Sequence, residues 1–252
     1  MGAAGLRAIS IFMPAYNVAR HVERTVGRIP PGVWAITRTL WIVNDGSTDS
    51  TAEALERLAR GHPQVRVVTF PANRGYGEAV REGLLRARGE DVDAAVCLHA
   101  DGQYAPEEIP RLLDALAARR LDLVQGSRIA SGTAISGGMP LYKYVAGRVL
   151  TAIENAAFRS KMTDYHSGFL CYGGRALSSI PFERLSASYD FDLEAIACAR
   201  ARGLRVGEVP VTTHYGDEKS NLWSVPYGFR VLGVVARYLT GRYAPARKEP
   251  RA

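Results

Sequence analysis

The chain has 252 residues, of which 47% are apolar and 23% are charged, and its formal net charge is +7. This composition is close to the globular average, so it excludes a disordered, collagen-like or coiled-coil chain, and the length suits one large α/β domain. Most of the basic excess lies at the end of the chain, because the segment from Arg230 to Ala252 holds six basic residues and one acidic residue. We therefore expect this basic segment either to lie in solvent or to contact an anionic surface.

Short apolar runs alternate with helical patterns in the first half of the chain. Runs rich in β-branched residues predict strands over residues 9–13, 40–43, 65–70, 94–98 and 121–125. Amphipathic patterns predict helices over residues 19–29, 48–60, 77–88 and 106–119. This alternation is typical of βαβ units, so we expect an α/β fold with a Rossmann-like, mainly parallel sheet flanked by helices. Ligands of such sheets bind at the carboxyl ends of the strands, which makes the residues after each strand the candidates for a site.

The pattern is looser after residue 126. A long loop rich in Gly and Ser, over residues 127–140, precedes the remaining predicted elements. These are a helix over 142–159, a strand over 168–172, a helix over 191–202, a strand over 205–211 and a last helix over 223–239. No repeat or linker divides the chain, so we expect one main domain over residues 1–222. The last helix and the basic tail, over 223–252, belong to this domain or form an element at a membrane surface.

The cysteine pattern and the lack of apolar spans bear on where the protein works. Three cysteines with no C-x-x-C spacing predict buried free thiols in a reducing compartment. The N-terminus lacks the apolar region of a signal peptide, and no uncharged apolar stretch reaches the roughly 18 residues of a transmembrane helix. We therefore expect a cytoplasmic protein, which is peripheral at the inner face of the membrane if its last helix binds lipid.

Polar or glycine-rich turns follow all five strands predicted in the first half. Asn17 after the first strand and Asp45 after the second can exchange hydrogen bonds with a base or a ribose. The glycines around Arg74 allow a close approach of backbone to ligand, and Arg128 can neutralise a phosphate as a planar donor. Each group alone is also typical of an ordinary turn, a helix cap or a solvated surface. The prediction of a site rests on their occurrence together at one edge of the sheet.

His99, Asp101 and Gln103 follow the fourth predicted strand at alternate positions. In an extended segment this spacing points all three side chains to one side. Two oxygens and one imidazole nitrogen suit Mg²⁺ or Mn²⁺ bridging a diphosphate, and the imidazole favours Mn²⁺. Alternatively, His99 only forms a hydrogen bond at the end of the strand. Together, the residues of these turns suit a ligand that is a nucleoside diphosphate with a further group attached. The Walker motif of P-loop NTPases is absent from the sequence.

These turns resemble, in order, the motifs of the family 2 glycosyltransferases, which have the GT-A fold. The matching segments are residues 14–17 (PAYN), 45–49 (DGSTD), 73–79 (NRGYGEA), 101–103 (DGQ) with 106–107, 126–128 (GSR), 164–169 (DYHSGF), 208–210 (EVP) and the loop 214–220. The resemblance extends over about residues 8–222. Within the family, the chain looks most like the dolichyl- or polyprenyl-phosphate mannose and glucose synthases.

The resemblance implies an inverting transferase that moves a hexose from a nucleotide sugar, linked to UDP or GDP, to a polyprenyl or dolichyl phosphate. It implies a divalent metal, Mg²⁺ or Mn²⁺, held by Asp101, Gln103 and His99, and catalytic roles for Asp101, Arg128 and Asp164. The donor-binding residues that it implies are Pro14, Ala15, Tyr16, Asn17, Asp45, Gly46, Arg74, Gly75, Asp101, Lys219 and Ser220.

The sequence departs from the family pattern at three places, one of which is Val18, where the first motif often has Glu. His99 stands where an acidic residue is usual, so a metal there would meet less negative charge. His214 stands where arginine is frequent, and we expect Lys219 to supply the positive charge for the donor diphosphate instead.

Two other functions stay open on the sequence. One is transfer to a soluble hydroxyl acceptor, which needs a base, and Asp164, Asp190 and Asp192 are the candidates. The other is a non-catalytic protein that binds a nucleotide sugar and has lost its metal site at His99.

The last helix also has two interpretations, namely an amphipathic helix packed on the core and an element attracted to anionic lipid. Nucleic acid is not expected as a partner, because the chain has no nucleic-acid-binding motif.

Overall fold

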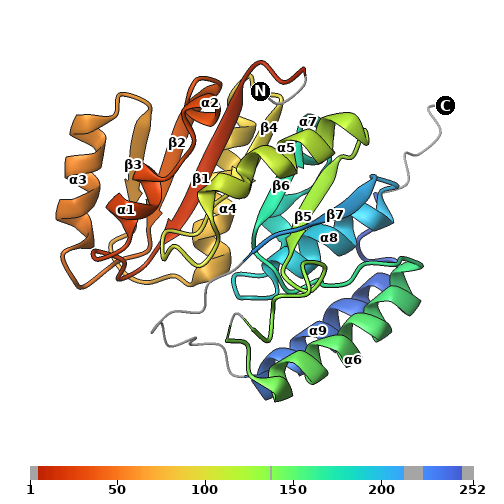
Figure 1. Ribbon diagram of the computed structural model, residues 1–252. Helices are drawn as coiled ribbons and strands as arrows, with labels where there is room; N and C mark the ends of the chain where they lie inside the picture. Colours follow the sequence, from red (N-terminus) through yellow and green to blue (C-terminus); the bar gives the residue numbers. More distant parts are fainter. Residues whose placement is uncertain (1–4, 137, 213–223, 246–252) are drawn as a thin grey trace.

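The computed structural model of the chain describes residues 5–136, 138–212 and 224–245. These residues form a seven-stranded sheet with the strand order β3-β2-β1-β4-β6-β5-β7 (Figure 1). The strands are β1 (Ile9–Ala15), β2 (Thr37–Asn44), β3 (Val65–Thr69), β4 (Ala94–Cys97), β5 (Leu123–Ser127), β6 (Leu170–Gly173) and β7 (Val206–Pro210). Neighbouring strands are parallel except for the two pairs that β6 makes, with β4 and with β5.

Helices cover both faces of the sheet, and successive strand residues supply the two cores because their side chains alternate between faces. On one face, the core around Ile11 and Met13 is covered by α1 (Val22–Gly27), α2 (Pro31–Trp34), α3 (Thr51–Gly61) and α5 (Ile109–Ala118). On the other face, the core around Phe12 is covered by α4 (Tyr76–Arg88), α7 (Gly174–Ser179) and α8 (Phe191–Ala201). Two 3₁₀ helices, Pro106–Glu108 and Phe182–Arg184, precede α5 and follow α7.

The helices α6 (Leu141–Phe158) and α9 (Ser224–Leu239) lie side by side at one end of the molecule (Figure 1). α9 also packs against α8, and it buries Val231 and Val234 in the same core as α8. None of the helices formed by the described residues is long and apolar enough to cross a membrane.

The α/β class, the mainly parallel sheet and the flanking helices agree with the sequence prediction. All three cysteines are buried and free, as predicted. The direction of β6 was not predicted, because a short apolar run carries no signal for parallel or antiparallel pairing. α1 is shorter than the predicted helix over 19–29, and α2 and α7 were missed because helices of four and six residues show little periodicity.

The topology brings the ends of six strands, β1 to β5 and β7, to one edge of the sheet. β1 to β4 are mutually parallel, and β5 runs in the same direction as β4 because both are antiparallel to β6. β6 starts at the edge where the others end, so the segment 163–169 that precedes it lies at that edge as well. The predicted site therefore has a single location in the fold.

Gly77 is a position where the packing of α4 can be tested. A Cβ at Gly77 would lie 2.4 Å from the carbonyl carbon of Ala187, whereas a Cβ at Gly147 in α6 would meet no atom within 4 Å. We expect Gly77→Ala to lower the free energy of unfolding by about 1–3 kcal/mol, the usual cost of overpacking. Gly147→Ala, the matched control, should keep stability or raise it by up to about 1 kcal/mol, because alanine favours the helix. Urea unfolding measures both, and equal stability of Gly77→Ala and the wild type would contradict this packing.

Candidate active site

The loops after β1 and β2 are held together by main-chain and side-chain hydrogen bonds. Asn17 has a left-handed backbone (φ 53°), and its Oδ1 accepts a hydrogen bond from the N–H of Thr48 at 2.8 Å. The N–H of Asn17 donates to Oγ of Ser47 at 3.0 Å, and the N–H of Val18 donates to Oγ1 of Thr51 at 2.8 Å. Asn17, a predicted donor-binding residue, therefore shapes the edge of the site in addition to any contact with a ligand.

Asp45 connects the end of β2 to the loop after β3. Its carboxylate is buried, and its two oxygens accept hydrogen bonds from the N–H groups of Arg74 (2.6 Å) and Gly75 (3.0 Å). Gly46 has φ 64°, and a Cβ there would lie 2.3 Å from the carbonyl carbon of Ala72. A carboxylate has lone pairs for about four hydrogen bonds, so Asp45 retains acceptor capacity for a base while it holds this loop.

The remaining predicted donor-side residues of the described chain lie at the same edge. Tyr16 leaves 42% of its surface exposed, while Pro14 is half-buried and Ala15 is buried. Arg74 is exposed, and its guanidinium lies 4.9 Å from the centre of the Phe70 ring. Lys219 and Ser220 lie outside the described residues, so their roles stay predictions.

The segment after β4 is a turn, so the predicted extended arrangement of His99, Asp101 and Gln103 is wrong. Gly102 has φ 79°, and Oδ1 of Asp101 accepts a hydrogen bond from the N–H of Gln103 at 2.9 Å. This turn breaks the two-residue alternation that would have pointed the three side chains to one side. Asp101 and Gln103 are half-buried within the turn.

His99 lies among aromatic rings. Its Nε2 is 3.1 Å from the hydroxyl of Tyr76, and its ring meets that of Tyr104 edge-on, with centroids 5.0 Å apart. The glycine at 168 makes room for it, since a Cβ there would lie 2.6 Å from Nε2. Burial lowers the pKa of His99, against the opposing effect of Asp101, so the imidazole is neutral at pH 7. These contacts agree with the alternative in which His99 only forms a hydrogen bond at the end of the strand. Metal ligation by His99 stays a prediction.

Tyr76 also contacts Asp192 in the first turn of α8, and this contact was not anticipated. The Tyr76 hydroxyl donates to Oδ2 of Asp192 at 2.7 Å. Burial raises the pKa of Asp192 to about 7, and the hydrogen bond from Tyr76 opposes this shift. Asp192 is one of the bases considered for a hydroxyl acceptor, and a pKa near the working pH suits that role.

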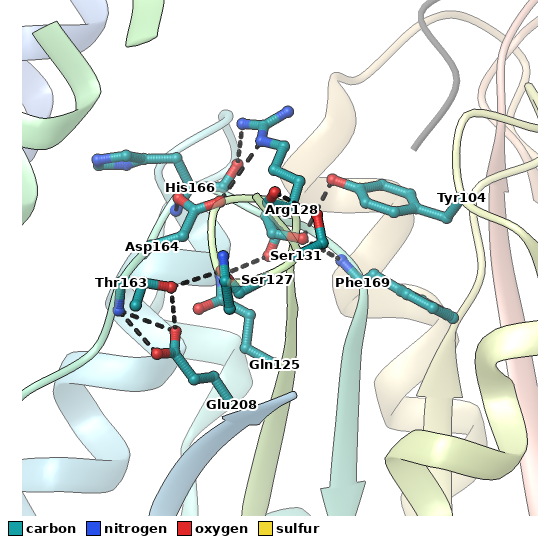
Figure 2. Close-up of polar contacts among 12 residues, drawn as sticks. Tyr104, Gln125, Ser127, Arg128, Ser131, Thr163, Asp164, His166, Phe169 and Glu208 are labelled. Carbon is teal, nitrogen blue, oxygen red and sulfur yellow. Dashed lines mark hydrogen bonds and ion pairs between the residues drawn. The ribbon is translucent and has the colours of Figure 1, made fainter. Parts of the chain in front are cut away.

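Arg128, directly after β5, meets Asp164 in the segment that precedes β6 (Figure 2). Nε of Arg128 lies 3.4 Å from Oδ2 of Asp164, and Nη2 of Arg128 donates to the carbonyl oxygen of His166 at 3.2 Å. Oδ1 of Asp164 accepts the N–H of His166 at 2.8 Å. Asp164 is 3% exposed and Arg128 is largely buried, so this pair forms a charged group held by the main chain of the segment before β6.

Glu208 of β7 holds the same segment from below (Figure 2). Its carboxylate accepts the N–H of Thr163 at 2.8 and 2.9 Å and the hydroxyl of Thr163 at 3.0 Å. The Thr163 hydroxyl lies 2.7 Å from Oγ of Ser127, the residue before Arg128. The sequence motif that contains Glu208 gave no role for it, and the structure shows that it positions residues 163–166.

The described residues do not contain a group of three His, Cys, Asp or Glu side chains arranged to hold a metal ion. Mg²⁺ in phosphate-transfer sites is commonly held by one or two carboxylates together with the phosphates of the substrate. Asp101, with Gln103 beside it in an open turn, fits such a partial site.

Comparison with known proteins identifies the family. Residues 10–185 match the family model described as glycosyl transferase family 2, so the chain belongs to this family and is a glycosyltransferase. Over 239 residues it is 27% identical to a UDP-N-acetylglucosamine–dolichyl-phosphate N-acetylglucosaminyltransferase of Methanococcus voltae, a match that covers 90% of this chain and 94% of that one. It is 30% identical over 210 residues to the dolichol-phosphate mannosyltransferase of Saccharomyces cerevisiae, covering 81% of this chain and 76% of the relative.

A solved structure shows the same fold. Glucosyl-3-phosphoglycerate synthase of Mycobacterium tuberculosis, in complex with Mn²⁺, UDP and phosphoglyceric acid, superposes with a TM-score of 0.67. The two chains are 22% identical, and the superposition covers 97% of this chain and 81% of the other. The likeness confirms the predicted GT-A fold.

The two hydrogen bonds of Asp45 predict a defect in both stability and donor binding. In Asp45→Asn one acceptor oxygen becomes an amide that faces a main-chain N–H, so we expect a loss of about 1–3 kcal/mol in the free energy of unfolding. Because the loop of Arg74 and Gly75 is then released, the affinity for nucleoside diphosphate should fall as well. Urea unfolding and calorimetric titration with UDP and GDP measure the two effects. Asp114→Asn, at an exposed position of α5, is the control, and wild-type stability and affinity of Asp45→Asn would contradict the role of these two hydrogen bonds.

Proposed function

We propose that the chain is an inverting hexosyltransferase that moves a sugar from a UDP- or GDP-linked donor to a polyprenyl or dolichyl phosphate. The observation that carries the proposal is the largely buried Arg128, which is held against Asp164 at the same sheet edge as the Asp101 turn. A guanidinium fixed in this way suits a phosphate that must be oriented as well as attracted. The names of the relatives that match almost the whole chain, which act on dolichyl phosphate, support the same acceptor class.

The donor side of the proposed site is the edge formed by the loops after β1, β2 and β3. Asn17, Asp45 and Arg74 are the polar groups that the loops present there, and Tyr16 adds an exposed aromatic ring. We assign the nucleoside to this part and the diphosphate to the neighbouring turn at Asp101. A divalent metal bound by Asp101 and Gln103 would neutralise the charge of the leaving diphosphate.

The acceptor side explains why the reaction can proceed without a base. A polyprenyl phosphate is already an anion, so its oxygen can attack the sugar carbon directly. Arg128 then orients the phosphate, and Asp164 fixes Arg128, which leaves positioning and electrostatics as the means of catalysis. Attack from the face opposite the leaving diphosphate inverts the configuration at that carbon.

A second candidate function is transfer to a hydroxyl acceptor, and the raised pKa of Asp192 is the observation that favours it. A base with a pKa of about 7 would make kcat fall as the pH drops below that value, because only the ionised carboxylate accepts a proton. In the phosphate mechanism Asp192 is not needed for proton transfer. Asp192→Asn therefore separates the two: it should abolish transfer to a hydroxyl and leave most transfer to a phosphate.

The direct test of the proposed function is a panel of UDP- and GDP-sugars with Mg²⁺ or Mn²⁺, assayed by the release of nucleoside diphosphate. We expect one donor to be consumed only when polyprenyl phosphate is present. Consumption with soluble sugars or aglycones, and none with polyprenyl phosphate, would contradict the proposal in favour of the second candidate.

Within this reaction, Arg128→Lys should lower kcat/KM for polyprenyl phosphate roughly 100-fold, because lysine keeps the charge but lacks the planar pair of donors. The KM for the donor should change little. Arg148→Lys is the matched control, since Arg148 also donates to this segment, at the carbonyl of Thr163 (3.1 Å), but is exposed. Equal losses in both variants would contradict the assignment of Arg128 to the acceptor.

We also propose that α6 and α9 belong to the catalytic domain and rest on the inner face of a membrane. α6 exposes an apolar row with a spacing of four residues, formed by Leu141, Val145, Val149 and Ile153. α9 beside it exposes Phe229, Leu232 and Leu239. Arg159, Lys161 and Arg230 are exposed cations on or beside the two helices, so the surface combines apolar area with positive charge, as anionic bilayers require.

Vesicle binding tests this surface. The double variant Val145→Gln with Val149→Gln should bind vesicles of phosphatidylglycerol and phosphatidylcholine at least about tenfold more weakly than the wild type, because two exposed apolar side chains are lost. Val67→Gln on β3 is the control, since this exposed valine lies on the strand at the far end of the sheet. Sedimentation with the vesicles measures binding, and equal binding by the double variant and the control contradicts the proposal.

A further inference from the structure

A cluster of buried polar side chains lies behind Arg128, between the segment 163–168 and the helices α6 and α9. Glu154 of α6 is fully buried, and neither of its carboxyl oxygens has a hydrogen-bond partner among the described residues. Its Oε2 lies 3.4 Å from Nε2 of His166, and Nδ1 of the same ring lies 3.1 Å from the hydroxyl of Tyr227 on α9. Buried carboxyl groups without hydrogen-bond partners are rare in folded proteins, which indicates a specific role for Glu154.

Glu154 is an uncharged acid at neutral pH. Burial raises its pKa to about 9, and the negative charge of Asp164 adds to the shift. Burial likewise lowers the pKa of His166, so the imidazole beside Glu154 is neutral. Arg128 is paired with Asp164 beside this cluster.

The two tyrosine phenols near Glu154 carry no charge at neutral pH, whereas Arg200 and Glu208 are further ionisable groups beside the same segment. Tyr165 precedes His166 in the loop and Tyr227 comes from α9, and burial raises the pKa of both phenols. Arg200 of α8 interacts with Tyr165 and donates to Oγ of Ser160, and Glu208 accepts hydrogen bonds from Thr163. Ionisation of Glu154 would add one negative charge to this set of groups near Arg128.

The main chain of His166 connects this cluster to the catalytic pair. Its N–H donates to Asp164 and its carbonyl oxygen accepts from Arg128, as described above. A protonated Glu154 can donate its O–H to Nε2 of His166, which leaves Nδ1 to carry the proton and donate to Tyr227. The ring is then fixed from α6 and from α9, and fixing the ring fixes the peptide that holds both Asp164 and Arg128.

We propose that Glu154, His166 and Tyr227 are positioning residues for Arg128, and that Glu154 acts as the neutral acid. The inference rests on the proposed function, in which Arg128 binds the phosphate of the acceptor. An ionised Glu154 would add a second carboxylate charge next to Asp164, and the resulting negative pocket would repel the phosphate. The neutral acid supplies the hydrogen bond to His166 without that charge.

Kinetics as a function of pH test the proposal. In the wild type, KM for polyprenyl phosphate should rise roughly tenfold between about pH 7 and about pH 10, while KM for the nucleotide sugar stays constant. The phosphate itself does not titrate in this range, because its second pKa is about 6. Glu154→Gln keeps the shape and a hydrogen-bond donor but cannot ionise, so it should retain neutral-pH kinetics within about threefold and lose the alkaline rise.

Two further variants separate positioning from mere packing. Glu154→Leu has no donor for His166, so it should raise the acceptor KM about tenfold at neutral pH with the donor KM unchanged. Tyr227→Phe removes only a hydroxyl and should raise the acceptor KM about threefold, which keeps the test available if Glu154→Leu does not fold. If Glu154→Gln shows the same alkaline rise as the wild type, or the same defect as Glu154→Leu, the proposal is overturned.

A measurement without substrate distinguishes failure of this inference from failure of the proposed function. Unfolded Glu154 loses its proton near 4.5, whereas folded Glu154 keeps it up to about 9. Between these values the unfolded state binds fewer protons, so the stability of the wild type falls as the pH rises. Glu154→Gln cannot ionise at this position, so it should not show this loss of stability with rising pH. Its urea midpoint should fall less than that of the wild type between about pH 6 and about pH 9. Parallel curves overturn the inference alone, whereas absence of any transfer to polyprenyl phosphate by the wild type overturns the proposed function and the positioning role with it.

Discussion

The carboxylate of Asp45 holds the loop after β3 against the end of β2, and the proposed donor side of the site depends on this contact. Its oxygens accept the N–H groups of Arg74 and Gly75, while Asn17 joins the loops after β1 and β2 in the same manner. Three strand ends thereby form one surface, which side-chain acceptors join by hydrogen bonds to the main chain.

The acceptor side depends on the reversed direction of β6. Because β6 starts at the edge where β5 ends, residues 163–169 lie beside Arg128, and Asp164 reaches the guanidinium from there. Glu208 on β7 holds the same segment as an acceptor of three hydrogen bonds, and Glu154 on α6 lies beside His166. In the proposed reaction, one antiparallel strand thus adds an acceptor region to a sheet whose parallel strands build the donor region.

The sequence alone predicts the alternation of strands and helices, the edge of the sheet and most of the residues at that edge, because apolar periodicity and turn residues are local signals. It does not predict the direction of β6, since strand pairing depends on distant contacts. Asp101-Gly102 is itself a local turn signal, which the extended arrangement expected from His99 to Gln103 left out of account. His99 turns toward Tyr76 instead. Glu154 was not predicted as a functional residue. An acidic residue beside apolar helix residues such as Ile153 can nevertheless indicate a buried carboxyl group.

The proposed reaction forms a bond between the anomeric carbon of a hexose and the oxygen of a lipid-borne phosphate, with inversion. Proton and phosphorus NMR of the product from an α-linked nucleotide sugar can test for this bond and its configuration. We expect an anomeric proton coupled to phosphorus and a β configuration in the purified lipid product. A product with retained α configuration, or with the sugar joined to a hydroxyl oxygen and no coupling to phosphorus, would contradict it.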